Sequence, residues 1–355
     1  MKMKKIAALL LACCLSVGFA ACGRTTEETT VDETEIAQTA APAETEAPEI
    51  VEENTELSGK VTVYMPSPAG LADKLAAAFT EKTGVEVEQF QGTTGEILAR
   101  LETEQANPVA DVVILASWSD GLSMKEDGQI MSYVPENADK ANWIDEDSML
   151  FGTSASAVGV IYNTTIYPEL SADWADLAST DYADDIAIPD PEKSGACKDF
   201  LAGFVTGVDN GEEIMQSWAD NGLTVPGANA AALEAVTTGE KGILIAGVDY
   251  NAYSSMAKGE PISIYYPSTG TVVNPRPAMI MNTAPNVDNA KAFIDFLYSE
   301  EAQQMVADAY LLPGRNDVQC ENRTNLAEIP QLPTDWDAMI PVATDTAAKL
   351  NEICQ

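Results

Sequence analysis

Hydroxyl side chains beside glycine recur where an apolar strand pattern gives way to a helical one. The clearest case is Gly92-Thr93-Thr94-Gly95, between the segments VEVEQF and EILARLETEQ. A helix start offers unpaired N–H groups and a partial positive charge, and glycine lets a ligand approach the backbone closely. Thr93 and Glu96 also have capping-box spacing, so the alternative is that the loop only caps its own helix.

Related loops follow other expected strands. Ser194 and Gly195 open a helical segment after a strand that ends near Asp190, and Ser67 follows the first strand. Ser117 and Trp118 follow the third, where spacing to Asp120 again permits simple capping. Hydroxyls and helix N-termini suit an anion or a hydroxyl-rich solute, and they do not choose between the two.

Composition excludes several chemistries. The chain has no histidine, no CxxC spacing and no G-x-x-x-x-G-K-[ST] loop. Zinc sites of the usual kinds, Ser-His-Asp and Cys-His catalysis, and P-loop nucleotide hydrolysis are therefore not expected. The net charge of −37 makes nucleic acid and anionic lipid surfaces poor partners. We expect no cofactor.

Short apolar strands alternate with amphipathic helices from Gly59 onward. KVTVYM, VEVEQF and DVVILA are predicted strands, separated by the helices LADKLAAAFTEKTG and EILARLETEQ. Such alternation predicts parallel pairing in an α/β sheet. A second unit of the same kind follows, and residues 290–309 and 333–354 are predicted to form two closing helices.

Two long strand patterns, residues 152–163 and 270–281, leave the first unit and return to it. They predict a two-lobed α/β clamshell with two crossing hinge strands. We expect the first lobe to comprise residues 59–153 plus 280–355, and the second to comprise residues 154–279.

The N-terminus has the pattern of a targeting segment. Three lysines precede the apolar run IAALLLACCLSVGFA, which predicts a signal peptide over residues 1–21. Phe19-Ala20-Ala21-Cys22 resembles the site where a bacterial lipoprotein is cut and Cys22 is acylated; cleavage of an ordinary secretory signal is the alternative. Residues 22–58 are acidic, rich in Thr, Glu, Ala and Pro, and predicted to be a disordered tether.

Three cysteines remain beyond this region. A bridge between Cys320 and Cys354 is possible outside the cell, and buried free thiols at these positions and at Cys197 are the alternative.

Seven stretches together resemble the extracellular solute-binding proteins of ABC transporters, in the ferric-type branch of the two-lobed type II periplasmic binding fold. They occur in the family's order over most of residues 60–320: AAAFTEKTGVEVE, GTTGEILARLETEQANPVADVVI, GVIYN, IPDPEKSGACKDFL, AKGEPISIYYPSTGTVVNP, AKAFIDFLYSEEAQQMVAD and LLPGRNDV. The resemblance implies a lipid-anchored receptor on the extracellular face of the bacterial cytoplasmic membrane. It would be monomeric, close on a small-molecule solute and deliver it to a permease driven by a separate ATPase.

The resemblance raises the question of iron. Ferric binders of this family carry adjacent tyrosines after the strand that corresponds to KGILIAGV, whereas this chain has Asp249 and Tyr250 there. Direct clamping by two phenolates is therefore doubtful, although Asp249, Tyr250 and Glu96 could form an oxygen site. Other branches take phosphorylated compounds or phosphonates, for which Arg276 could supply a guanidinium.

The expected function is therefore binding of a small anionic or oxygen-rich solute, with ferric iron or a ferric chelate as the alternative. An enzyme is disfavoured because no paired carboxylates occupy loops at strand ends, and an adhesion or sensory domain because no aromatic patch or repeat is visible. The candidate ligand-binding residues are Ser67, Thr93, Thr94, Gly95, Ser117, Trp118, Asp190, Ser194, Gly195, Asp249, Tyr250 and Arg276.

Overall fold

The computed structural model describes residues 57–68 and 70–354. The described residues belong to a single compact unit, Thr55–Gln355. The predicted signal peptide, the predicted acylation site at Cys22 and nearly all of the predicted tether lie outside the described residues. None of the described helices is long and apolar enough to cross a membrane.

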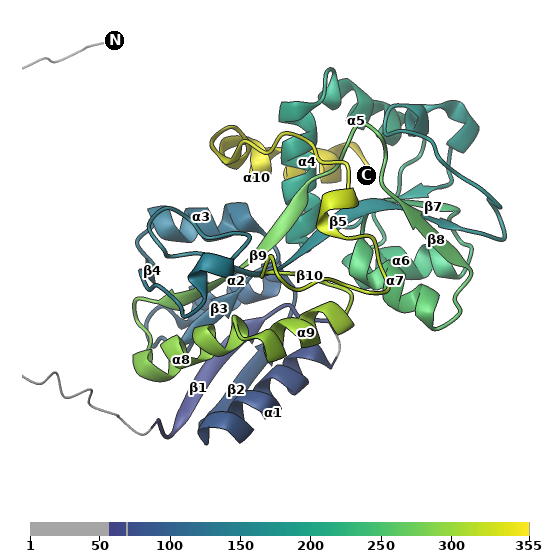
Figure 1. Ribbon diagram of the computed structural model, residues 1–355. Coiled ribbons are helices and arrows are strands. Elements are labelled where there is room, and N and C mark those ends of the chain that lie inside the picture. The colour runs from purple at the N-terminus through teal and green to yellow at the C-terminus, as the bar shows by residue number, and fades with distance from the viewer. Residues whose placement is uncertain (1–56, 69, 355) are drawn as a thin grey trace, which may run out of the picture. The chain divides into compact units, whose positions relative to one another are not determined.

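A ten-stranded sheet runs through the molecule in the order β2-β1-β3-β9-β5-β7-β6 (Figure 1), with β4 paired to β9 and both β8 and β10 paired to β5. The strands are β1 (Lys60–Met65), β2 (Glu86–Gln91), β3 (Val112–Ile114), β4 (Ile130–Met131), β5 (Phe151–Asn163), β6 (Ile186–Ala187), β7 (Ile243–Val248), β8 (Ile262–Tyr265), β9 (Val273–Met281) and β10 (Leu312–Pro313).

Ten α-helices among the described residues flank this sheet. They are α1 (Leu71–Thr83), α2 (Thr94–Glu104), α3 (Trp118–Glu126), α4 (Gly195–Gly207), α5 (Gly211–Asp220), α6 (Asn229–Thr237), α7 (Asp249–Ala257), α8 (Val287–Leu297), α9 (Glu300–Asp308) and α10 (Trp336–Ile353).

The two long strands predicted from the sequence are present as β5 and β9. They pair antiparallel, from Phe151 opposite Ala278 to Ala157 opposite Val273. β9 continues the sheet toward the parallel strands β1 to β3, and β5 continues it toward β7. We call β1–β4 with α1–α3, α8 and α9 the first lobe, and β6–β8 with α4–α7 the second lobe.

Local signals explain where some of the described helices begin and end. α1 ends at Gly84, which has the left-handed φ of 76°. Residues 290–309 do not form the single helix expected from the sequence. The chain breaks between α8 and α9, because Ser299 adopts an extended backbone and its hydroxyl caps α9 at the N–H of Ala302.

Helix α10 contacts α4 and α5 of the second lobe and α3 of the first. It therefore lies across both lobes. The lobe boundaries expected at residues 153 and 280 remain predictions.

Aromatic side chains fill the second lobe. The ring of Phe200 lies 4.8 Å from that of Trp174 and 5.5 Å from that of Phe204, which stacks on Trp218 at 5.1 Å. The three cysteines in the described part of the chain are free, so the bridge between Cys320 and Cys354 is not formed. Cys320 instead donates to the carbonyl of Leu311.

Replacing Phe200 by alanine should lower the free energy of unfolding by about 3–5 kcal/mol, because it empties the centre of this aromatic group. Urea denaturation would measure the change. Val134→Ala is the control, since Val134 is 66% exposed and should change stability by less than about 0.5 kcal/mol. A loss below about 1 kcal/mol for Phe200→Ala would contradict this packing.

Candidate functional site

A cavity of about 370 Å³ lies between the two lobes. Its walls come from the loops after β1, β2 and β3 on one side and from the starts of α4, α6 and α7 on the other. Seven of the twelve candidate residues line it: Ser67, Thr93, Thr94, Ser194, Gly195, Tyr250 and Arg276. The structure therefore brings together loops that are up to about two hundred residues apart in sequence.

Three helix N-termini face this cavity. At α2, Thr93 and Glu96 form the predicted capping box, which leaves the next N–H groups of the first turn without a side-chain cap. At α4, the Ser194 hydroxyl accepts from the N–H of Cys197 and donates to Asn229 at 2.8 Å. At the N-termini of α2 and α4, a side chain therefore caps one N–H group while other first-turn N–H groups have no side-chain cap.

The third N-terminus, that of α6, was not among the predicted binding elements. Its N-cap residue is Ala228, whose side chain cannot accept a hydrogen bond, and residues 228–230 line the cavity. The first N–H groups of α6 thus lack a side-chain cap. The sequence signal was a helix that starts after Pro226-Gly227 without a capping residue.

Two cations line the cavity: Lys193, which pairs with Asp190, and Arg276, which has no ion pair among the described residues. Arg276 sits on β9, is only 2% exposed, and donates to the carbonyl of Pro66. Its guanidinium lies 5.8 Å from the centre of the Tyr250 ring. Burial lowers the pKa of Arg276, as expected for a charge removed from water.

No carboxylate among the described residues lies within ion-pair distance of this guanidinium, although the more distant charge of Asp249 acts on it. Arg100, Arg315 and Arg323 each form an ion pair with an acid, and Arg276 does not. A buried charge without a counter-ion is costly unless a ligand supplies one. The site is therefore electrostatically incomplete without an anion.

Asp249 does not line the cavity, contrary to the sequence prediction. It is fully buried, and its carboxylate accepts from Arg323 at 2.5 Å and from the Ala157 N–H at 3.0 Å. The Tyr266 hydroxyl donates to it as well. The sequence did not reveal this pairing because Arg323 lies 74 residues from Asp249. A role for Asp249 in ligand binding stays a prediction.

Four other candidates also lie outside this cavity. The Asp190 carboxylate accepts from Lys193 and Asn351 and lines a separate groove. Ser117 and Trp118 are buried where α3 meets α4. A Cβ on Gly95 would come within 2.7 Å of the Glu192 carbonyl, so this glycine permits contact between the lobes rather than approach by a ligand in the cavity.

The oxygen donors suggested for a ferric site are not assembled. Glu96 lines the cavity, but its carboxylate accepts from the Thr93 N–H at 2.8 Å as part of the capping box. The Asp249 carboxylate is paired with Arg323. Of the three suggested oxygen donors, only Tyr250 therefore lines the cavity without such a contact to a neighbouring residue. Within residues 57–68 and 70–354, no cluster of three or more Asp, Glu, Cys or His side chains could hold a metal.

A second cavity of about 490 Å³ adjoins the first and shares Pro68, Ala230, Tyr250 and Asn251 with it. Its walls carry hydroxyl and amide groups together with charges of both signs, including Lys74, Lys258 and Glu260. The two cavities together have room for more than a small inorganic anion.

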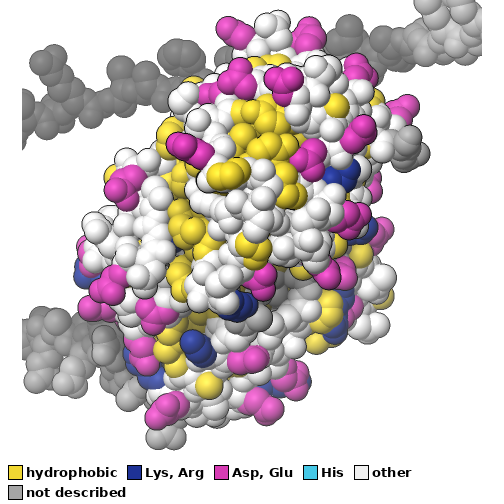
Figure 2. Space-filling view, turned by 90° about the vertical axis from the view of Figure 1, so that its right-hand side faces the viewer, with side chains coloured by type: hydrophobic (Ala, Val, Ile, Leu, Met, Phe, Trp, Pro, Cys, Tyr) yellow, Lys and Arg dark blue, Asp and Glu magenta, His cyan; other side chains and the backbone are white. Residues whose placement is uncertain are grey.

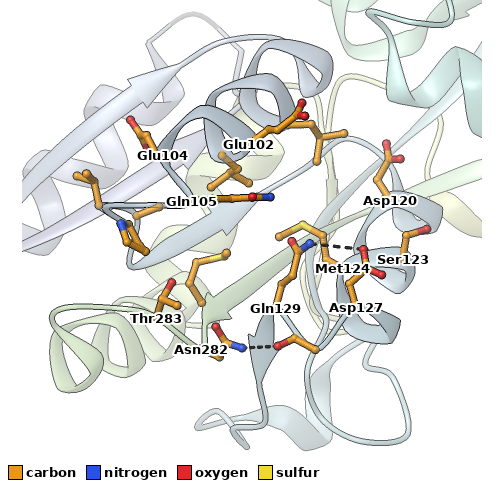
Figure 3. Close-up of a pocket in the computed structure, with 17 residues that line it drawn as sticks. Glu102, Glu104, Gln105, Asp120, Ser123, Met124, Asp127, Gln129, Asn282 and Thr283 are labelled. Atoms are coloured by element: carbon orange, nitrogen blue, oxygen red, sulfur yellow. Dashed lines mark hydrogen bonds between the residues drawn. The ribbon is translucent and has the colours of Figure 1, made fainter.

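A cavity of similar size, about 500 Å³, lies elsewhere on the first lobe (Figure 3). It is formed by α2, α3 and the end of β9, and its charged lining residues, Glu102, Glu104, Asp120 and Asp127, are all acidic. None of the candidate residues lines it. Its size alone does not make it the binding site, because no convergent helix N-termini or cations face it.

The sequence pattern of the bacterial extracellular solute-binding proteins matches residues 107–340. The chain belongs to this family. Its members are solute-binding proteins of ABC transporters and not enzymes, which confirms the resemblance noted in the sequence and the expectation of a binding protein.

The names of the relatives refer to different ligands. The chain is 28% identical over 267 residues to iron uptake protein A1 of Synechocystis sp., covering 70% of this chain and 73% of that protein. It is 26% identical over 253 residues to a Salmonella typhimurium periplasmic protein provisionally named as 2-aminoethylphosphonate-binding, covering 68% and 73%.

Among solved structures, iron-bound HitA from Pseudomonas aeruginosa matches with a TM-score of 0.73 at 20% identity, covering 82% of this chain and 99% of that one. This likeness confirms the two-lobed periplasmic binding fold.

Replacing Arg323 by methionine should lower the free energy of unfolding by about 3–5 kcal/mol, because it leaves the Asp249 carboxylate buried without its counter-ion. Thermal or urea denaturation would measure the loss. Adding Asp249→Asn to Arg323→Met should recover part of it, since the uncompensated charge is then gone. Equal stability of the single variant and the parent protein would show that the pair is not buried as described.

Proposed function

We propose that this protein binds a small organic anion, a phosphate ester or a phosphonate, in the cavity between its lobes. The single observation that carries this proposal is the buried guanidinium of Arg276, which forms no direct ion pair with a carboxylate of the described residues. An oxyanion beside Arg276 would supply the missing negative charge and accept its hydrogen bonds.

The helix N-termini support the same ligand class. First-turn N–H groups of α2, α4 and α6 border one cavity, and helix N-termini favour phosphate-like groups through both hydrogen bonds and the helix dipole. The hydroxyls of Ser67, Thr93 and Thr94 border the same space. We assign them to the first lobe's side of the ligand, with Ser194, Gly195 and Tyr250 on the other.

The organic part of the solute has room in the adjoining cavity. Tyr250 and Asn251 lie at the boundary between the two spaces, and Ser254 and Ser255 line the second. A solute with its anionic group at Arg276 and a polar remainder beyond Tyr250 would use both.

The overall negative charge does not argue against an anionic ligand. Outside the predicted signal and tether, the sequence carries 45 acidic and 15 basic residues. Figure 2 shows the acidic side chains spread over the visible face rather than gathered at one place. At physiological salt such charges are screened within about 8 Å, so Arg276 and the nearby helix starts dominate inside the cavity.

In this proposal the protein is a monomer, anchored through acylated Cys22 and an acidic tether over residues 22–58 to the extracellular face of the cytoplasmic membrane. Closure of the lobes on the solute selects the conformation that is delivered to the permease, whose partner ATPase drives import.

A ferric chelate is the second candidate. The name of the Synechocystis relative favours it, and an anionic chelator could contact Arg276 while Tyr250 approached the metal. Bare ferric iron fits less well, because the cavity's own cation would repel it and Asp249 is already paired.

Binding of 2-aminoethylphosphonate, a hexose phosphate, inorganic phosphate and ferric citrate should be compared by isothermal titration calorimetry. We expect the phosphorus compounds to bind and Arg276→Met to raise their Kd by about two orders of magnitude, because a buried charged hydrogen bond is lost. Arg100→Met is the control, since Arg100 pairs with Glu104 on the first lobe and does not line the cavity.

Unchanged affinity in Arg276→Met would contradict the assignment of the anion to this cavity. Binding of ferric citrate with no binding of any phosphorus compound would replace the proposal by its alternative.

A further inference from the structure

The first turn of α3 in the first lobe is capped partly by a carboxylate from the second lobe. Asp199 of α4 is fully buried and accepts from the Trp118 N–H at 2.9 Å and from the Ser117 hydroxyl at 3.1 Å. The Ser119 hydroxyl also donates to it. A carboxylate at a helix N-terminus is favourable through hydrogen bonds and the helix dipole.

An ion pair beside it joins the same two helices. Lys198, the neighbour of Asp199 on α4, pairs with Asp120 on α3, and both side chains are only 14% exposed. The second carboxylate oxygen of Asp120 is buried without a hydrogen-bond partner. We call these five side chains the clasp: Lys198 and Asp199 on α4, Ser119 and Asp120 on α3, and Ser117, which caps the start of α3.

The clasp lies directly against the ligand cavity. A Cβ on Gly195 would come within 2.9 Å of the Ala116 carbonyl and within 2.7 Å of the Ser117 Cβ, so the two lobes touch here. Ala116 and Gly195 both line the cavity. The N–H of Ala116 in turn donates to the Thr94 hydroxyl at 3.1 Å, which links the contact to the start of α2.

Both helices pack on the hinge strand that carries Arg276. Gly121 of α3 packs against Pro277, and the Asn274 side chain donates to the Ala196 carbonyl of α4. A change in β9 between these positions would alter the distance between the helices. The clasp therefore spans the place where the lobes must move relative to each other.

We propose that Asp199 and Lys198 are positioning residues for solute binding, which hold the starts of α2 and α4 at the separation where both contact the ligand. The proposal rests on the function proposed above for its ligand, but the contact itself does not depend on which solute binds. Opening the lobes breaks the clasp, so the clasp raises the fraction of molecules in the binding-competent conformation.

A double-mutant cycle tests this across the lobes. Asp120→Ala, Lys198→Ala and the double variant would be titrated with inorganic phosphate, and the unliganded proteins measured by small-angle X-ray scattering. We expect each single variant to raise the Kd by about three- to tenfold and the double variant to add little more, because the pair acts as one contact. The radius of gyration of the unliganded variants should exceed that of the parent.

The exposed pair Lys60 and Glu88 supplies the matched control, because both residues belong to the first lobe. Its alanine variants should change neither affinity nor scattering. Additive effects of Asp120→Ala and Lys198→Ala, or lower melting temperatures with unchanged affinity and scattering, would overturn the proposal. If neither inorganic phosphate nor any of the organic phosphorus compounds binds the parent protein, the proposed function is in error, and the scattering of the unliganded variants still tests the clasp.

A pH profile separates positioning from simple packing. Burial raises the pKa of the Asp199 carboxyl to about 6; Lys198 lowers that pKa and Asp120 raises it. From α10, which packs on both helices, Thr344, Ala347 and Ala348 line the adjoining groove, and none of these three titrates. In the proposed open form Asp199 would face water, where an aspartate titrates near 4, so closure would take up a proton between about pH 4 and pH 6.

Lowering the pH from about 7.5 to about 5 should therefore make the unliganded protein more compact in scattering, since the closed form binds the proton more tightly. Asp199→Asn should lose this dependence while retaining one oxygen acceptor for the α3 cap. The same pH profile in Asp199→Asn and the parent would contradict the role of Asp199.

Discussion

The antiparallel pairing of β5 with β9 is the constraint on which the rest of the structure depends. These two strands continue the sheet from the first lobe into the second, so the C-terminal ends of strands from both lobes face a common space. β9 also carries Arg276 into that space. The same pairing that joins the lobes thus places the one arginine without an ion pair, among the described residues, in the wall of the cavity.

Electrostatics explain why two neighbouring charges have different roles. Asp249 and Arg323 neutralise each other within the fold, so the position where a metal ligand was suggested is already satisfied by an internal cation. Arg276 lies close by with its charge unbalanced. Within the fold, Asp249 is thus paired and Arg276 is not. This difference favours an anionic ligand, although the protein is acidic overall.

Local patterns predicted much of this arrangement. The Thr93 and Glu96 capping box, the Ser194 cap and both crossing strands could be read from spacing and periodicity, because each depends on residues a few positions apart. The same loops were placed in one cavity because strand ends in such sheets converge. Asp249 could not be assigned correctly, since its partner Arg323 lies in a distant segment with no periodic pattern. The open N-terminus of α6 was not predicted, because no capping side chain marks it in the sequence.

Binding of an anion at Arg276 is tested most directly by a crystal structure of the protein, from crystals grown with 2-aminoethylphosphonate. We expect density for the phosphonate between the lobes, with its oxygens within hydrogen-bond distance of Arg276 and of first-turn N–H groups of α2, α4 or α6. A phosphonate bound away from Arg276, or a cavity that excludes it and instead holds a metal on Tyr250 and Glu96, would show that Arg276 does not hold the anion.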